Sequence, residues 1–144
     1  MALHLIKLSV GIHTIADLKA RQDWLVKNPR RKDGPPEPYH VTRMAPSRRD
    51  KVLDGGSIYW VLKRVVQVRQ RILDLDTVRG EDGIERCAIV LDRTLVPVAP
   101  APRKPFQGWR YLPHADAPAD LVGGAGGDDL PEGLRRKLVE LGAW

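Results

Sequence analysis

The chain of 144 residues is 42% hydrophobic and 29% charged, with 13 Gly, 12 Pro and a single Cys. This composition is typical of one globular domain with many loops, argues against a helical bundle, and excludes an intramolecular disulfide and a cysteine-based zinc site. No continuous apolar stretch approaches the roughly 18 residues that a membrane-spanning helix needs, so we expect a cytoplasmic protein with no membrane partner.

The net charge of +6 is unevenly distributed along the chain. Residues 1–71 contain fifteen Lys and Arg against six Asp and Glu, a balance of +9, whereas residues 72–144 contain nine against twelve, a balance of −3. If the first half occupies one face of the fold, its positive potential would steer polyanions toward that face. The alternative is a basic, solvated surface without a ligand.

The first 38 residues predict a strand, a helix and a loop. Residues 3–10 form an apolar-rich run that ends at a glycine, which is typical of a central strand. Thr14 is positioned to cap a helix that runs to about residue 26, with Asp17 at its third position. The charged Pro/Gly segment over residues 28–38 then predicts a flexible loop.

A short strand and a short helix are expected next. Residues 39–44 alternate and are rich in β-forming residues, and they contain the first plausible ligand groups, His40 and Arg43. Ser47 is expected to cap the helix, with Asp50 three residues further on, before a Gly-Gly pair ends it.

The longest apolar-rich segment, residues 55–75, reads GGSIYWVLKRVVQVRQRILDL and contains a dense group of cations. We interpret residues 57–63 as a strand, 64–71 as a short helix or turn, and 72–78 as a second strand, because aromatic and β-branched residues follow the two glycines. In this interpretation one turn is flanked by the cations Lys63, Arg64, Arg69 and Arg71. The apolar residues also have helical spacing, so a single helix over residues 57–75 is the alternative.

The pattern that follows predicts an antiparallel hairpin and an edge strand. The sequence RGEDG at residues 79–83 is typical of a tight turn, and residues 84–91 are expected to pair with residues 72–78. Cys87 is expected to be a buried structural residue of this strand. A further strand is predicted over residues 94–98, and nearby prolines exclude it from the centre of a sheet.

Residues 104–112, KPFQGWRYL, hold three aromatic side chains close to several cations. Trp109 and Tyr111 alternate as in a strand, and with Phe106 they could close one end of the core. Alternatively, the rings form a platform on which bases stack while cations hold phosphates. The cations around the rings are Arg103, Lys104 and Arg110.

The last part of the chain predicts a flexible loop over residues 113–128, which contains GGAGG, and a helix over residues 130–141 with Asp129 as its cap. The sequence contains no glycine-rich loop with the Lys that grips phosphate, and no zinc, serine-hydrolase or kinase motif. We therefore expect neither a metal nor a cofactor.

Three strings form a recognisable pattern: IKLSVG near the start, GGSIYWVLKRVVQVRQRIL in the middle, and RKPFQGWRYL followed by DAPADL. This pattern spans nearly the whole chain and resembles domain-of-unknown-function family 1489, a family of alphaproteobacterial proteins. The resemblance implies no particular activity, substrate or catalytic residue. The strand ending at Lys63 and the following VVQVRQ are more loosely similar to PUA-like and ASCH-like small barrels, many of which bind RNA or modified nucleotides. Gln67 stands where ASCH-type patterns show Glu, so the similarity does not imply hydrolase activity.

Together these patterns predict a single α+β domain over residues 1–144, a mixed, partly closed, PUA-like β-barrel with peripheral helices. We expect it to bind RNA or a nucleotide-like anion in a basic cleft flanked by aromatic side chains. The expected binding residues are His40, Arg43, Tyr59, Lys63, Arg64, Gln67, Arg69, Gln70, Arg71, Arg103, Lys104, Gln107, Trp109 and Arg110.

Two other classes of function are open. The first is a small enzyme acting on a modified nucleotide or similar anion, with Lys63, His40, or His114 and the nearby Asp116 as reactive groups. The second is a protein-interaction module anchored by the aromatic segment around Trp109.

Overall fold

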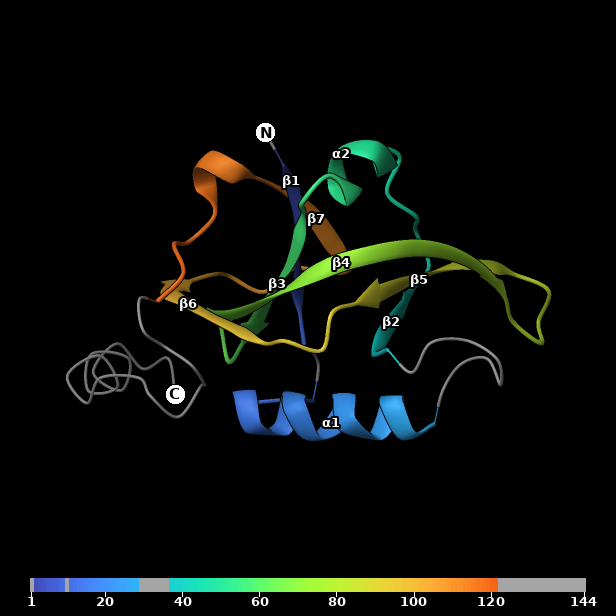
Figure 1. Cartoon of the computed structure of the whole chain (residues 1–144), viewed down its shortest axis with the longest axis horizontal. Coiled ribbons are helices and arrows are strands. Elements are labelled where there is room, and N and C mark those ends of the chain that lie inside the picture. The colour runs from blue at the N-terminus through green and yellow to red at the C-terminus, as the bar shows by residue number, and fades with distance from the viewer. Residues whose placement is uncertain (1, 10, 29–36, 122–144) are drawn as a thin grey trace.

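The structure of the protein is a computed structural model, which describes residues 2–9, 11–28 and 37–121. These residues form seven strands, two α-helices and a short 3-10 helix (Figure 1). In chain order the elements are β1 (Leu3–Leu8), α1 (Ile15–Lys27), β2 (Tyr39–Thr42), α2 (Arg49–Leu53), β3 (Ser57–Leu62), β4 (Val65–Arg79), β5 (Glu85–Leu91), β6 (Val96–Pro102), β7 (Trp109–Pro113) and η1 (His114–Asp116).

The strands form one mixed sheet in the order β2-β5-β4-β3-β1-β7, with β6 paired to β4 outside this path. The pair β1 and β3 is parallel, and the remaining pairs are antiparallel. The protein is therefore a sheet-rich α+β domain. The described sheet is open, with β2 and β7 at the two ends of the path, so the predicted partly closed barrel is not confirmed.

The long strand β4 organises the sheet, and it corrects the interpretation of residues 64–71. The chain reverses over only two residues, Lys63 and Arg64, and β4 then continues for 15 residues. The predicted helix or turn over residues 64–71 is therefore wrong, as is the alternative single helix over residues 57–75. Polar side chains within β4 are hydrogen-bonded inside the folded domain: Gln67 donates to the Leu62 carbonyl, and Gln70 accepts from the Trp60 indole N–H.

Side chains of β1 and β3 alternate between the two faces of the sheet. Leu5 and Trp60 belong to one buried cluster, whereas Ile6 and Tyr59 belong to a second cluster on the opposite face. All six residues of β3 are buried, as expected for a strand covered on both faces. The central position predicted for residues 3–10 is confirmed, because β1 lies between β3 and β7.

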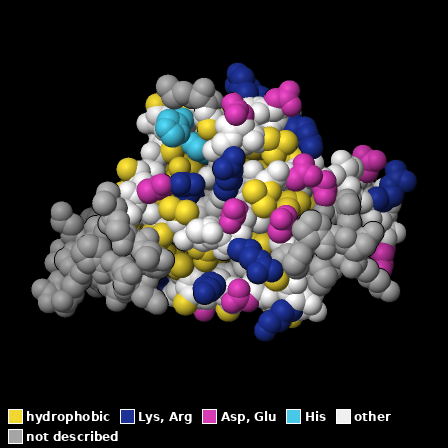
Figure 2. Space-filling model, in the orientation of Figure 1, with side chains coloured by type: hydrophobic (Ala, Val, Ile, Leu, Met, Phe, Trp, Pro, Cys, Tyr) yellow, Lys and Arg dark blue, Asp and Glu magenta, His cyan; other side chains and the backbone are white. Residues whose placement is uncertain are grey.

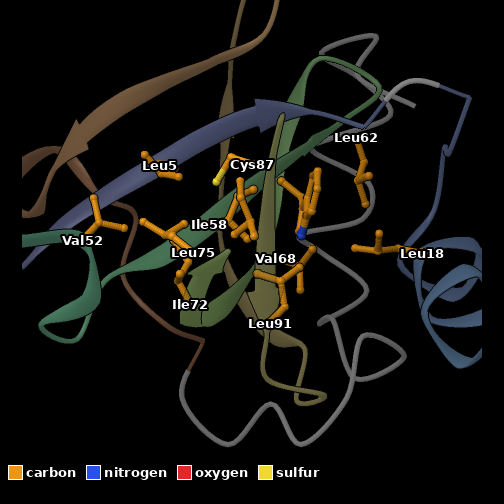
Figure 3. Packing of buried hydrophobic residues seen from close by; sticks show 12 residues of the cluster. Leu5, Leu18, Val52, Ile58, Leu62, Val68, Ile72, Leu75, Cys87 and Leu91 are labelled. Atoms are coloured by element: carbon orange, nitrogen blue, oxygen red, sulfur yellow. The ribbon is translucent and has the colours of Figure 1, made fainter. Parts of the chain in front are cut away.

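Both α-helices cover the first cluster. Figure 3 shows Leu18 of α1 facing Leu62 at one end of the cluster, and Val52 of α2 near Leu5 at the other end. The capping prediction for α1 is confirmed, because Thr14 Oγ1 accepts a hydrogen bond of 3.0 Å from the backbone N–H of Asp17.

The start of α2 differs from the prediction. The helix begins at Arg49, and its N-cap Arg48 makes no capping hydrogen bond through its side chain. The hydroxyl of Ser47 lies 3.3 Å from the hydroxyl of Tyr111, so Ser47 is not the cap. The helix ends before Gly56, where a Cβ atom would lie 2.2 Å from the Val52 carbonyl oxygen, so only glycine fits.

Most of the remaining predictions that the structure reaches are confirmed. The turn near residues 79–83 joins β4 to its antiparallel partner β5, and Cys87 is buried within β5. The strand predicted at 94–98 is β6, which begins two residues later, at Val96. One edge of β6 pairs with β4. The flexible loop predicted over residues 113–128 is wrong in its described part, which forms η1 and then bonds to β6 through Ala119 and Leu121. The rest of that loop, the predicted helix over residues 130–141 and most of the loop over 28–38 lie outside the described residues. Among the described helices, none is long and apolar enough to cross a membrane.

Candidate functional site

An open cleft of about 570 Å³ lies between α1 and the sheet, and we call it the α1 cleft. Its walls come from the end of β1, one side of α1, strand β2 and a single residue of β3. The residues that line it are Lys7, Leu8, Ser9, Ile12, Leu18, Arg21, Gln22, Trp24, Leu25, Tyr39, His40, Val41 and Trp60. Figure 1 shows α1 lying beneath the sheet, with β2 at one end of the sheet path.

Aromatic rings provide much of the cleft wall. The ring of His40 meets the ring of Trp60 edge to face, with 5.4 Å between the centroids. Trp24 on α1 is 52% exposed, which is unusual for so large an apolar side chain. The guanidinium of Arg21 lies 4.9 Å from the centre of the Trp24 ring, so a cation and an aromatic face are presented together.

The cleft is basic, and three side chains show how its charges interact. Burial lowers the pKa of Lys7. Burial, together with the charges of Lys7 and Arg21, lowers the pKa of His40 to about 4. His40 is therefore uncharged at neutral pH, and the described lining contains no Asp or Glu to balance the two cations.

A buried layer of amides holds the floor of the cleft in place. The indole N–H of Trp60 donates to Gln70 Oε1 at 2.8 Å, and the amides of Gln22 and Gln70 donate to each other. Gln70 also donates to the Asp92 carbonyl at 2.9 Å. Gln70, which we predicted as a binding residue, is fully buried and instead ties α1, β3 and β4 together below the cleft.

Four of the predicted binding residues gather at the turn between β3 and β4. Lys63 and Arg64 form this turn, and the backbone N–H of Arg103 donates to the Arg64 carbonyl at 2.7 Å, which brings Lys104 to the same place. All four side chains are exposed. We call this group the basic turn.

The basic turn lies at the same end of the sheet as the α1 cleft. Because β1 and β3 are parallel, with Leu8 opposite Val61, both strands end on the same side. Ser9 lines the cleft just after β1, and its N–H donates to the Val61 carbonyl at 3.1 Å. The carboxyl ends of parallel strands are a common place for ligand binding.

The backbone of the basic turn is strained. Lys63 and Arg64 have φ values of 49° and 65°, in the left-handed region where side chains other than glycine and asparagine are disfavoured. Two-residue hairpin turns of this kind usually contain Asn-Gly. Two cations therefore occupy positions that conformational preference alone would not give them, at a cost of about 1 kcal/mol each.

The other predicted residues lie elsewhere. Tyr59 and Arg69 face the opposite side of the sheet from the α1 cleft, and Gln67 is buried. Arg43, Arg71, Gln107 and Arg110 are exposed outside the cleft, and the guanidinium of Arg110 lies 5.1 Å from the centre of the Phe106 ring.

The aromatic segment around Trp109 packs onto the domain. Trp109 and Tyr111 are partly buried against the first core cluster, and Phe106 is partly buried against the second. The indole N–H of Trp109 donates to the Met44 carbonyl at 2.7 Å. Trp109 lies on β7 and Arg69 on β4, with β3 and β1 between them. These contacts support the interpretation that the aromatic side chains close the core.

Sequence reasoning missed most of the cleft, because only His40 is common to the prediction and the lining. The missed groups with binding chemistry are Lys7, Arg21, Trp24, Tyr39 and Trp60. One available signal was the spacing of Arg21 and Trp24, three residues apart on a helix, which places them on one helical face. Among the described residues, no three His, Cys, Asp or Glu side chains gather closely enough to hold a metal ion.

Comparison with known proteins gives one match. A family model described as "Protein of unknown function (DUF1489)" matches residues 5–144, which is nearly the whole chain. No curated protein and no solved structure matches the chain. The match confirms the family resemblance carried by the three sequence strings, and the chain belongs to the DUF1489 family.

Proposed function

We propose that the α1 cleft and the basic turn together bind RNA or a nucleotide-like anion. The observation that carries this proposal is the combination of two unbalanced cations, Lys7 and Arg21, with exposed aromatic surface in one cleft. Bases stack on aromatic and guanidinium planes, and cations hold phosphates. A volume of about 570 Å³ is within the usual range for a cleft that holds a small organic ligand.

In this proposal the cleft holds a base and the basic turn holds the phosphates that follow it. Trp24 offers the most open ring, so we place the stacked base there. Lys63 and Arg64 then extend the positive surface beyond the cleft, at the same end of β1 and β3.

The test is a fluorescence anisotropy titration of a labelled single-stranded RNA 10-mer with the full chain, repeated with unlabelled nucleotide as competitor. We expect the double variant Lys7→Gln, Arg21→Gln to weaken binding by roughly 10- to 100-fold, because two charge-assisted contacts are lost. Trp24→Ala should weaken it roughly tenfold through lost stacking.

The matched control is Arg79→Gln, which removes one exposed cation at the far end of β4, where it pairs only loosely with Glu85 at 3.6 Å. This variant should bind as the unmodified chain does. The proposal fails if the chain binds neither RNA nor nucleotide near physiological salt, or if Arg79→Gln weakens binding as much as the cleft variants do.

A second candidate function is an enzyme that acts on a nucleotide-like anion in the same cleft. The observation in its favour is His40, a largely buried side chain in the cleft whose pKa is lowered to about 4, mainly by burial and then by Lys7 and Arg21. A neutral imidazole can accept or donate a proton during a reaction. Chemical turnover that is lost in His40→Gln while binding is retained would favour the enzyme over the binding module.

A further inference from the structure

A second recess, of about 340 Å³, lies on the opposite face of the sheet from the α1 cleft, and we call it the histidine recess. It is formed at the start of β1 and β3, with Arg69 of β4 and the segment from η1 to Asp120. Its polar lining consists of His4, Tyr59, Arg69, His114 and Asp120. Figure 2 shows histidine side chains gathered on the surface near η1.

The hydrogen bonds in the recess determine which histidine nitrogens carry protons. The backbone N–H of Ser57 donates to His4 Nδ1 at 3.0 Å, so this nitrogen carries no proton. Burial, assisted by the charges of His114 and Arg69, lowers the pKa of His4 to about 4, so His4 is neutral and protonated at Nε2. His4 Nε2 therefore donates to His114 Nδ1, at 3.0 Å. Because His114 Nδ1 accepts this bond, the ring N–H of His114 is at Nε2, which is therefore a donor.

Arg69 is held in place but retains spare donors. Its Nε and Nη2 donate to the two carboxylate oxygens of Asp120 at 2.6 and 2.7 Å, and its Nη1 donates to Ser57 Oγ at 3.0 Å. These three bonds use three of the five guanidinium N–H groups. The two-pronged contact balances the charge of Asp120, and this hydrogen bonding lowers the pKa of the Asp120 carboxyl.

The hydroxyl of Tyr59 is the observation that indicates a ligand. Tyr59 is 3% exposed and lines the recess, yet its hydroxyl makes no hydrogen bond to any described residue. Among the described residues, the only fully enclosed side-chain polar atom without a partner is Gln67 Oε1. The small exposed part of Tyr59 therefore includes its hydroxyl, which reaches the open recess. Burial raises the pKa of Tyr59, so the hydroxyl keeps its proton and acts as a donor.

We propose that the histidine recess binds a small oxyanion, of the phosphate or carboxylate type, through the Tyr59 hydroxyl, His114 Nε2–H and the two spare N–H groups of Arg69. All these groups are donors, while the strongest acceptor in the recess, the Asp120 carboxylate, is already bound to Arg69 on both oxygens. An oxyanion offers several acceptor atoms in a small volume, which suits a recess lined by several donors. Because the described charges of the recess balance, the anion is held by directed hydrogen bonds rather than by excess positive charge.

A purely structural role does not account for the tyrosine. Phenylalanine would fill the same space, because the Tyr59 hydroxyl makes no hydrogen bond to a described residue that the substitution would remove. The ring of Tyr59 already packs edge to face on His4, with 5.1 Å between centroids, and phenylalanine would keep this contact. The hydroxyl is therefore available to a ligand that enters the recess.

The test is an NMR titration of the histidine imidazole signals at pH 7.5 with inorganic phosphate and, separately, with acetate. Chloride is exchanged for the added anion so that ionic strength stays constant. The full chain carries the substitutions Lys7→Gln and Arg21→Gln, so that anions bound in the α1 cleft do not contribute. We expect the His4 and His114 signals to shift and saturate with at least one of the two anions, and the anion that saturates first identifies its type.

The variant Tyr59→Phe, in the same background, should lower the affinity for the anion that gives saturable shifts at least tenfold, without lowering the melting temperature. Tyr111→Phe is the matched control, because the Tyr111 hydroxyl contacts Ser47 and Arg48 away from the recess, and it should leave anion binding unchanged. If Tyr59→Phe does not fold, the exposed side chain of His114 provides a second variant, His114→Phe, with the same expected loss.

The proposal is overturned if neither anion produces saturable shifts, or if Tyr59→Phe binds the anion as tightly as the background chain. It is also overturned if Tyr111→Phe weakens binding as much as Tyr59→Phe does. Because the recess and the α1 cleft share no lining residue, failure here leaves the proposed RNA or nucleotide binding untouched, and the reverse also holds.

Discussion

The α1 cleft and the histidine recess are built on the same two strands and differ in how they treat charge. In the cleft, Lys7 and Arg21 have no described carboxylate beside them, whereas in the recess Arg69 is bound to Asp120 on two atoms. Alternation along β1 separates the two environments, since Lys7 faces one side of the sheet and His4 the other. The two faces of the β1–β3 pair thus adjoin different environments, one in which cations have no described carboxylate beside them and one in which a cation and a carboxylate balance each other.

The largest expected effect concerns the floor of the cleft. Gln70→Ala should lower the free energy of unfolding by about 3 kcal/mol, because Trp60 and Gln22 lose their buried partner and a cavity remains. Gln67→Leu is the matched control, since this buried amide makes one hydrogen bond and has an oxygen without a partner. We expect the control to change stability by less than about 1 kcal/mol in urea unfolding. Equal losses in both variants would show that the amide layer has no special role.

The next largest effect is the pH dependence of stability, to which one histidine from each site contributes. The pKa values of His4 and His40 are lowered to about 4 in the folded protein, from an ordinary 6.5. The unfolded chain therefore binds more protons, so stability is fully present above pH 6.5 and decreases as the pH falls toward 4. After allowance for partial solvent access, we expect a loss of about 2 kcal/mol for each histidine over this range.

Variants can separate the two contributions to this pH effect. His40→Gln should remove one part of the loss and leave the part due to His4, as measured by urea unfolding at pH 7 and pH 4.5. The double variant Lys7→Gln, Arg21→Gln should raise the pKa of His40, because it removes two neighbouring charges, and leave that of His4 unchanged. A shift of both histidine signals together in NMR would contradict the separation of the two sites.

A third prediction compares the salt dependence of binding. If RNA in the α1 cleft contacts about three cations through its phosphates, its affinity should fall roughly 15-fold between 50 and 200 mM salt. Binding of the oxyanion in the histidine recess should change less than about threefold, because the Arg69 and Asp120 charges already balance. An RNA affinity that does not change with salt concentration would contradict the role of Lys7, Arg21 and the basic turn.

The smallest effect concerns the strained turn. Arg64→Gly should raise the free energy of unfolding by about 1 kcal/mol, because glycine adopts the φ of 65° without strain. The same change removes one cation, so RNA binding should weaken by a few-fold while the histidine recess is unaffected. Thermal unfolding and anisotropy titration of one sample measure both effects. A loss of stability would show that the Arg64 side chain makes contacts that outweigh the backbone strain.

Local sequence patterns predicted most of the individual elements. The strand over residues 3–10, the Thr14 cap and the hairpin near residues 79–83 depend on nearby residues, and all three are confirmed. Residues 64–71 could not be interpreted locally, because the partners that allow polar side chains within β4 are distant. Gln70 meets Gln22 from 48 residues away, and Arg69 meets Asp120 from 51 residues away.

The same reason explains the outcome for the candidate site. Composition and charge predicted a basic, aromatic-flanked cleft, but the α1 cleft lies elsewhere and shares only His40 with the predicted residues. Lys7 interrupts the apolar run of residues 3–10, and its position in the cleft depends on the pairing of β1 with β3 and on the packing of α1. The histidine recess was still less accessible to local reasoning, since His4 and His114 are 110 residues apart.

The position of β1 between β3 and β7 has a consequence for how the chain folds. Both edges of β1 are hydrogen-bonded only after β3 and then β7, which come later in the chain, have paired with it. Pairings between such distant segments slow folding, so we expect refolding in milliseconds to seconds rather than microseconds. During synthesis, an apolar strand edge stays open until residue 113 has been added, and a chain that stops before β7 should aggregate for this reason.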